Sequence, residues 1–489
     1  MKSSPTPAAE GPPDHRGRRI LINMGALSGA SLWRIGVSFV LQILIARALG
    51  LEAIGQYVTV LAFLNVSQVA GELGIPGLLI RDLARRPDYR RAYFRTALVM
   101  QVIVAFLIWI VLVLIGRALP LSAEIATSLW LVGASLPLYA LTSLCRTLFQ
   151  AGERMEYVLG VEVFTNSLIL LMSLVVLFMN GGVVQLVATL LITQAMSAAL
   201  SLVLLLRCRL LAAPQVDVHV HLPTFWRQAR PFYALALADV FLNRVDILLL
   251  NLVTGDYVVG VYSLGYSVVR VVLKLTQSYW QALYPTLSRL LRSDADRYHR
   301  LSNLALRYGM IPVLPGAALV FGISAELLFL LFGATSSAAV PVLRLLVWTA
   351  PAFVFEAYAV VQLMIVGRPR DSMAVTVLHI IATALVLPPM ALYYGASGAA
   401  AAMLSAAILG AGAGLLFLVR NGIQYRIPRL GVMIFGAILA GVATAAVPGG
   451  WIIQISAGAA LCTVVFWVGG VVSATDVHLL RSALRSDGG

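Results

Sequence analysis

Apolar stretches long enough to cross a membrane recur along the whole chain and are separated by short polar connectors. An α-helix rises about 1.5 Å per residue, so about 20 apolar residues span the hydrocarbon core of a bilayer. The pattern predicts an all-α polytopic membrane protein with about fourteen transmembrane helices. The predicted spans are residues 22–47, 55–80, 95–116, 123–149, 157–179, 183–206, 231–253, 258–286, 304–332, 338–366, 372–394, 397–419, 429–447 and 450–473.

The composition supports this class. Apolar residues make up 60% of the chain and charged residues 11%, which leaves too little polar surface for a soluble protein. The three cysteines, Cys145, Cys208 and Cys462, lie far apart in or beside predicted spans, so neither a disulfide framework nor a metal site is expected. No cofactor motif occurs in the sequence, and no cofactor is expected.

Arginine is concentrated in every second connector, and all but two of the 35 basic residues are arginine. Because Lys and Arg in short loops remain on the cytoplasmic side, this alternation predicts that both termini are cytoplasmic and that the number of spans is even. Only Arg47 and Arg117 fall outside the pattern. The connectors that define it carry Arg81, Arg85, Arg86, Arg90, Arg91 and Arg95; Arg207, Arg209, Arg227 and Arg230; Arg289, Arg292, Arg297 and Arg300; Arg368 and Arg370; and Arg420, Arg426 and Arg429.

The same distribution argues against nucleic acid as a partner. The formal net charge is +14, but the charge lies in the connectors and no soluble domain is long enough to concentrate it. Residues 1–19 lack the apolar core and the cleavage site of a signal peptide, so a disordered cytoplasmic tail is predicted there.

A short internal repeat indicates two lobes. Gly50 and Gly55 precede Tyr57 in a GxxxxGxY pattern that returns 205 residues later, with glycines at 255 and 260 and a tyrosine at 262. A second match relates residues 150–154 to residues 365–370. Six spans separate the copies, so both lobes cross the membrane in the same sense, which predicts a pseudo-two-fold axis along the membrane normal.

The predicted organisation follows from this repeat. It comprises a disordered cytoplasmic tail (1–20), an N-lobe of helices 1–6 (21–210), a cytoplasmic linker (211–230), a C-lobe of helices 7–12 (231–420), two further helices (421–475) and a cytoplasmic tail (476–489).

Charged residues inside the spans are the candidates for function, because such residues are costly in a bilayer. Predicted helix 8 carries two cations, Arg270 and Lys274, on one polar face. At spacings of three and four residues the face continues in both directions. Its other members are Tyr262, Tyr266, Gln277, Gln281 and Tyr284.

Three other predicted helices have polar faces that we expect to point into the same cavity. Helix 1 contributes Arg34, with Ser38 and Gln42 beside it. The remaining members are Asn65, Gln68 and Glu72 on helix 2 and Asp239, Asn243 and Asp246 on helix 7. The hypothesis is a cavity in which Arg34, Arg270 and Lys274 bind an anionic substrate and in which Asp239 and Asp246 are candidates for ion coupling.

A structural explanation competes with this hypothesis. Arg270 and Lys274 could pair with Asp239 or Asp246 inside the fold and bind nothing. The same explanation is preferred for Arg146, Glu162, Arg344 and Glu356, which lie nearer span ends or helix contacts, and for the lone His379, which is typical of a satisfied buried imidazole.

Several segments resemble the Wzx-type polysaccharide flippases of the multidrug/oligosaccharidyl-lipid/polysaccharide (MOP) exporter superfamily. They read INMGALSGASLWRIGVSFVLQILIARALGLEAIGQY, GELGIPGLLIRDLARR, LCRTLFQAGERMEYVLGVEVFTNSL and NRVDILLLNLVTGDYVVGVYSLGYSV. The resemblance covers nearly the whole chain.

This resemblance implies two six-helix lobes in a V, followed by two C-terminal helices. It also implies a substrate, an undecaprenyl-pyrophosphate-linked oligosaccharide turned across the bacterial inner membrane for surface polysaccharide such as O-antigen or exopolysaccharide. The implied partners are H⁺ or Na⁺ as the coupling ion, membrane lipid, and a polysaccharide polymerase with glycosyltransferases. Arginine suits a pyrophosphate because its guanidinium donates two parallel hydrogen bonds.

Three other functions remain as alternatives. A multidrug exporter of the same fold takes amphipathic cations, which the intramembrane cations would repel. A membrane-embedded glycan polymerase or ligase needs a large extracytoplasmic loop, and no such loop is predicted. A scaffold that transports nothing would bear the cost of buried charges without a use for them. We therefore expect a transporter and not an enzyme.

Overall fold

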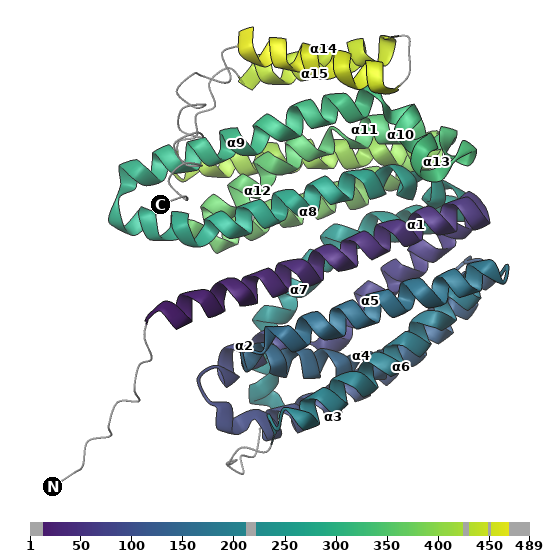
Figure 1. The fold of residues 1–489 in the computed structure, drawn as a ribbon, viewed down its shortest axis with the longest axis vertical. Coiled ribbons are helices and arrows are strands. Elements are labelled where there is room, and N and C mark those ends of the chain that lie inside the picture. The colour runs from purple at the N-terminus through teal and green to yellow at the C-terminus, as the bar shows by residue number, and fades with distance from the viewer. Residues whose placement is uncertain (1–12, 212–221, 424–429, 448–450, 469–489) are drawn as a thin grey trace. The chain divides into compact units, whose positions relative to one another are not determined.

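The computed structural model describes residues 13–211, 222–423, 430–447 and 451–468 (Figure 1). These residues form helices and no strands. The helices are α1 (Pro13–Glu72), α2 (Ile75–Leu83), η1 (Pro87–Tyr89), α3 (Arg90–Ala118), α4 (Ala123–Ala151), α5 (Met155–Phe178), α6 (Val183–Arg207), α7 (Leu222–Thr254), α8 (Asp256–Ser293), α9 (Ala295–Gly322), α10 (Ser324–Phe332), η2 (Ala334–Ala339), α11 (Val340–Leu346), α12 (Thr349–Ile365), α13 (Pro369–Arg420), α14 (Leu430–Ala446) and α15 (Trp451–Val468).

The predicted all-α fold with about fourteen transmembrane helices is confirmed. α1 and α13 each consist of two helices that meet at a glycine, and α11 continues into α12, so the described residues contain one helix for every predicted span. Nine helical segments among them are long and apolar enough to cross a membrane, and α14 and α15 supply two shorter apolar helices.

Several predicted boundaries differ from the structure. α1 begins at Pro13, within the predicted tail 1–20, and α7 begins at Leu222, within the predicted linker 211–230. The predicted span 304–332 is divided into α9, which begins at Ala295, and α10. The predicted span 55–80 ends at Glu72, because Leu73 and Gly74 have positive φ angles of 55° and 68° and α2 begins afresh at Ile75. Hydrophobicity alone does not reveal this break, since apolar residues continue through it.

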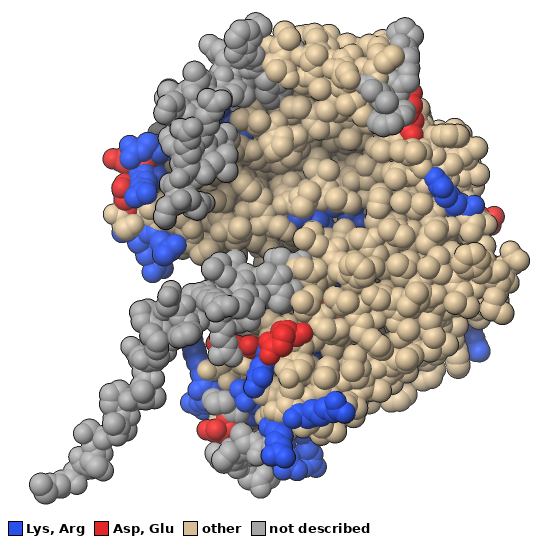
Figure 2. Space-filling model, in the orientation of Figure 1, with Lys and Arg blue, Asp and Glu red and all other residues tan. Residues whose placement is uncertain are grey.

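The outer faces of the helices are apolar, which identifies a multi-pass membrane protein. On α3 the side chains of Ile103, Phe106, Leu107, Ile110 and Leu114 are each about half exposed, at spacings of one helical turn. A soluble protein rarely exposes so continuous an apolar surface. Charged side chains lie elsewhere: Figure 2 shows a cluster of them where α8 meets α9.

Contacts divide the chain into two compact units. The first comprises Met1–Gln42 and Phe63–Leu237, and the second comprises Ile43–Ala62 and Ala238–Gly489. The core of the first unit joins α2 and α4 to the start of α7, where Leu79, Phe149 and Phe225 are buried. The core of the second unit is built from α8, α9 and α12 to α15.

The repeated glycines have the same backbone conformation. Gly50 has φ 85° and ψ −171°, and Gly255, 205 residues later, has φ 85° and ψ −177°. A side chain would be strained at both positions because φ is positive. At each glycine one helix ends and the next begins, so the repeat predicted from sequence is a repeated corner of the backbone.

The second glycine of each copy allows a close helix crossing within the second unit. A Cβ on Gly55 would collide with the carbonyl oxygen of Asp256, and a Cβ on Gly260 would collide with the carbonyl oxygen of Leu51. The offset of 205 relates one contact to the other, because it relates Gly55 to Gly260 and Leu51 to Asp256. The two helix starts are therefore related by a local pseudo-two-fold axis.

The second predicted match is also reproduced. The amide of Arg154 donates to the carbonyl of Phe149, and that of Arg368 donates to the carbonyl of Leu363, both at 2.8 Å. These bonds close the ends of α4 and α12 in the way of a Schellman motif. The offset is 214 residues, one fewer than the sequence match gave.

Candidate functional site

The polar face predicted on α8 exists in the second unit, and its burial changes along the helix. Tyr262 and Tyr266 are buried, with their rings stacked 5.7 Å apart. Arg270, Lys274 and Gln277 are half-buried, and Gln281 is exposed. Polar groups are therefore sealed near the start of α8 and become accessible toward its end.

Asp246 on α7 lies at the sealed end of this face. Its side chain is 1% exposed, and its Oδ2 accepts a hydrogen bond of 2.9 Å from the hydroxyl of Tyr262. Its Oδ1 has no hydrogen-bond partner among the described residues. A buried carboxylate oxygen without a hydrogen-bond donor costs free energy, so a functional role for Asp246 would explain why an acid stands at this position.

Asp239 has a different environment on the same helix. It is exposed, and its carboxylate accepts from the side-chain amide of Asn243 at 3.3 Å, while its backbone carbonyl accepts from the same amide at 2.7 Å. The predicted α7 residues thus split: Asp239 and Asn243 form one local group, and Asp246 belongs with the tyrosines of α8.

The competing explanation, internal ion pairs, receives no support here. Within residues 13–211, 222–423, 430–447 and 451–468, neither Asp239 nor Asp246 forms a salt bridge, and Arg270 forms none either. Lys274 donates a hydrogen bond of 2.9 Å to Oε1 of Gln277, one turn further along α8. The two cations therefore remain candidates for binding an anion.

In the first unit, Glu72 belongs to a polar network. Its carboxylate accepts hydrogen bonds from the hydroxyl of Tyr139 at 2.9 Å and from that of Ser143 at 2.5 Å, both on α4. Its backbone carbonyl accepts from the side chain of Gln101 at 3.1 Å. With Gln68 it lines a pocket of only about 10 Å³, which holds one water at most.

The network continues through residues that sequence reasoning assigned to packing. Arg146 lies over the ring of Tyr139 at 5.8 Å and forms a salt bridge with Glu162 on α5. Asn166 donates to the carboxylate of Glu162 at 3.0 Å. The signal for this group was available, since residues 139, 143 and 146 repeat the spacing of four and three seen on α8.

Two other predicted residues lie on α1. Asn65 is half-buried and Arg34 is exposed on α1. Arg34 belongs to the first unit, whereas Arg270 and Lys274 belong to the second. That the three cations share one cavity stays a prediction.

The lone His379 is buried, as predicted, and one of its two ring nitrogens has a partner. Its Nδ1 lies 2.7 Å from Oε2 of Glu356, and each side chain is 3% exposed. Nε2 of the imidazole has no described partner. Gly410 makes room for the pair, because a Cβ there would lie 2.8 Å from the Glu356 carboxylate and 3.1 Å from the imidazole.

Comparison with known proteins identifies relatives of the whole arrangement. A family model described as "Polysaccharide biosynthesis protein" matches residues 20–291. No curated protein matches the chain.

Solved structures with the same fold cover most of the chain. The lipid II flippase MurJ, in an inward closed conformation, has 13% identity and a TM-score of 0.72, covering 90% of this chain and 98% of its own. An inward-facing multidrug resistance transporter of the MATE family in the MOP superfamily has 12% identity and a TM-score of 0.59, covering 82% and 98%. The MATE multidrug transporter DinF-BH has 17% identity and a TM-score of 0.53, covering 84% and 96%.

Proposed function

The chain belongs to the polysaccharide biosynthesis protein family, and from this membership we propose that it is a flippase for a lipid-linked oligosaccharide. The proposed substrate is an undecaprenyl-pyrophosphate-linked oligosaccharide, which is moved from the cytoplasmic to the periplasmic leaflet of a bacterial inner membrane by alternating access. The fold shared with a lipid II flippase supports this class of transporter.

The observation that carries the proposal is the unpaired cation on the polar face of α8. Arg270 is half-buried, in a span, and forms no salt bridge with any described residue. A half-buried arginine within a predicted span that has no carboxylate partner suits a substrate that supplies the negative charge itself. In the proposal Arg270 and Lys274 hold the pyrophosphate, with Arg34 completing the set.

A multidrug exporter is the second candidate, because MATE transporters have the same fold. The cations on α8 oppose it. A cationic drug would be repelled by Arg270 and Lys274, whereas a pyrophosphate would be attracted. The flippase therefore remains the better proposal.

Ion coupling belongs to the same proposal. Asp246 is the stronger candidate of the two predicted acids, because it is buried and has an oxygen without a described donor, while Asp239 is exposed. Coupling to H⁺ or Na⁺ predicts that Asp246→Asn loses its dependence on the imposed gradient. Asp239→Asn is the matched control on the same helix, and an equal response of both variants would reject this assignment.

Substitution of the cations tests the flippase function. In proteoliposomes, Arg270→Gln and Lys274→Gln are expected to bind and flip lipid-linked oligosaccharide roughly tenfold or more weakly, because a charged hydrogen bond is lost. Lys274→Arg should retain more activity than Lys274→Gln. Arg117→Gln, which removes an exposed charge at the end of α3, is the control. Flipping at the wild-type rate by both Gln variants would contradict the proposal.

A further inference from the structure

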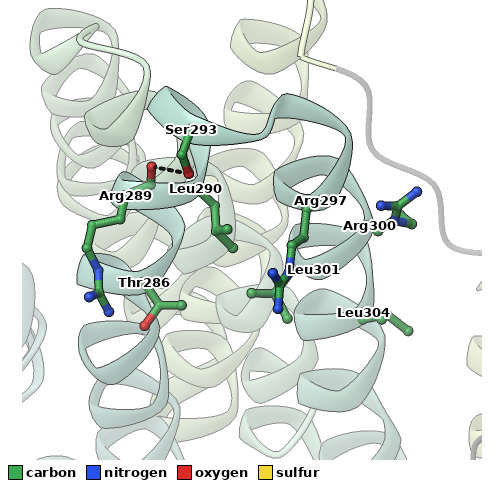
Figure 3. Close-up of a pocket in the computed structure, with 8 residues that line it drawn as sticks. All are labelled: Thr286, Arg289, Leu290, Ser293, Arg297, Arg300, Leu301 and Leu304. Carbon is green, nitrogen blue, oxygen red and sulfur yellow. Dashed lines mark hydrogen bonds between the residues drawn. The ribbon is translucent and has the colours of Figure 1, made fainter.

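A second cationic site lies in the second unit, between the adjoining ends of α8 and α9 (Figure 3). It is a pocket of about 600 Å³. Three arginines, two residues with hydroxyl groups and three leucines line it: Arg289, Arg297, Arg300, Thr286, Ser293, Leu290, Leu301 and Leu304. The pocket combines a cationic rim with an apolar wall.

The turn between the helices places these arginines at the adjoining ends of α8 and α9. α8 ends at Ser293 and α9 begins at Ala295, with Asp294 accepting a hydrogen bond of 2.9 Å from the backbone amide of Arg297. Figure 3 shows Arg297 pointing into the space between the two helices, beside Leu301, with Arg289 on the α8 side and Arg300 on the α9 side. The short turn fixes the two helix ends, so the pocket is a property of the fold.

The arginines of this pocket have no carboxylate partner among the described residues. None of its three guanidinium groups forms a salt bridge with an Asp or Glu in the part of the chain that the structure describes. Two carboxylates lie in the same segment of the chain. Asp294 caps α9, and Asp296 precedes Arg297 but forms no salt bridge with any of the three arginines among the described residues. Three guanidiniums that line one pocket make its potential positive, and guanidinium donors match the geometry of a phosphate well.

The pocket is separate from the polar face that carries Arg270. At about 100° per residue, Thr286 and Leu290 lie about 160° around α8 from Arg270, and Thr286 lies about 24 Å along the axis from it. The two sites therefore lie at different heights along one helix and on different faces of it. A ligand in the arginine pocket cannot be the same phosphate that Arg270 holds at that moment.

We propose that the arginine pocket binds a phosphate-bearing anion, carried by a membrane lipid or free in solution. The guanidiniums of Arg289, Arg297 and Arg300 bind the phosphate, and Leu290, Leu301 and Leu304 contact the apolar part of a lipid if that is the source. The charge pattern predicts this connector to be cytoplasmic, where basic pockets between membrane helices bind anionic headgroups. The site does not depend on the proposed flippase function.

Binding to the purified full-length chain in detergent tests this proposal. The probes are short-chain phosphatidylglycerol, phosphatidylcholine of the same chain length, and inorganic phosphate. Arg297→Gln and the double variant Arg289→Gln/Arg297→Gln are expected to bind the anionic probe at least tenfold more weakly than the unmodified chain. All three arginines are exposed, so their replacement should leave the fold and its thermal midpoint unchanged.

Arg292→Gln is the matched control, because it removes the same charge from the same end of α8 but from a residue that does not line the pocket. Saturable binding of phosphatidylglycerol that the pocket variants lose, and that is much tighter than the binding of inorganic phosphate, identifies a lipid as the source. Binding of inorganic phosphate at least as tight as that of phosphatidylglycerol identifies a soluble anion. Equal binding of both anions by the double variant, by Arg292→Gln and by the unmodified chain would overturn the proposal.

Discussion

The two units each join a pair of neighbouring helices through one ionisable pair inside the membrane-spanning region, but they do so with different chemistry. In the first unit Arg146 on α4 pairs with Glu162 on α5. In the second unit Glu356 on α12 contacts His379 on α13. The repeat offset of 214 residues relates α4 to α12 and α5 to the start of α13, so the pairs occupy related places.

The two pairs lie at different distances from the turns that join their helices. Arg146 lies five residues before the end of α4, whereas Glu356 lies nine residues before the end of α12. Glu162 lies seven residues after the start of α5, whereas His379 lies ten residues after the start of α13. The second pair is therefore about one helical turn further from the turn that joins its helices.

The pair that lies further from its turn is more buried, and this burial favours an ionisable residue that can be neutral. The side chains of Arg146 and Glu162 are 23% and 14% exposed, and those of the second pair are 3% exposed. An arginine cannot lose its charge, so it needs partial solvation and further partners such as Tyr139. A histidine can be neutral, so it can be enclosed completely with Glu356.

The largest effect is expected from removing the carboxylate of the first pair. Glu162→Gln leaves the permanent charge of Arg146 half-buried without its partner, which should cost about 3 kcal/mol of stability. Glu356→Gln should cost only about 1 kcal/mol, because a neutral His379 can still hydrogen-bond to the amide. The midpoints of thermal unfolding in detergent measure both losses.

The double variant Arg146→Gln/Glu162→Gln is the control for this comparison. It removes both charges, so it should recover much of the stability that Glu162→Gln loses. If Glu356→Gln proves as destabilising as Glu162→Gln, the difference between a permanent and a removable charge does not govern the two units.

Much of the fold could be predicted from the sequence, because hydrophobic length and arginine spacing act locally along the chain. The corners at Gly50 and Gly255 were visible as a repeated motif, since only glycine accepts their backbone angles readily. The break at Leu73 and Gly74 was not, because it interrupts an apolar run without changing its composition.

The candidate site was predicted less completely. The polar face of α8 follows from helical periodicity. The structure adds that the exposure of this face increases from the buried Tyr262 to the exposed Gln281. The partners of Glu72 could not be predicted, because Tyr139 and Ser143 lie about 70 residues away in the sequence. Periodicity shows which residues share a face, but only packing shows what that face meets.

A smaller effect is expected from filling the space beside the second pair. In Gly410→Ala the new Cβ would lie too close to Glu356 and His379, so the sealed pair must shift, at a cost of about 1–3 kcal/mol. Gly412→Ala on the same helix is the matched control, since no atom lies within 4 Å of its Cβ. Unfolding midpoints that fall equally in both variants would show that the helix tolerates neither alanine and that the pair is not the cause.

The smallest effect is expected from weakening the first network without touching its charges. Tyr139→Phe keeps the ring that Arg146 lies over but removes the hydroxyl that donates to Glu72. Ser143 still donates to the same carboxylate, so the loss should be one hydrogen bond, about 1 kcal/mol. Combining Tyr139→Phe with Ser143→Ala removes both donors and should cost more than the two single losses together, because Glu72 is then left without either hydroxyl. Additive losses in unfolding midpoint would instead show that other groups or water satisfy Glu72, and that the first unit does not depend on this network to hold its charges.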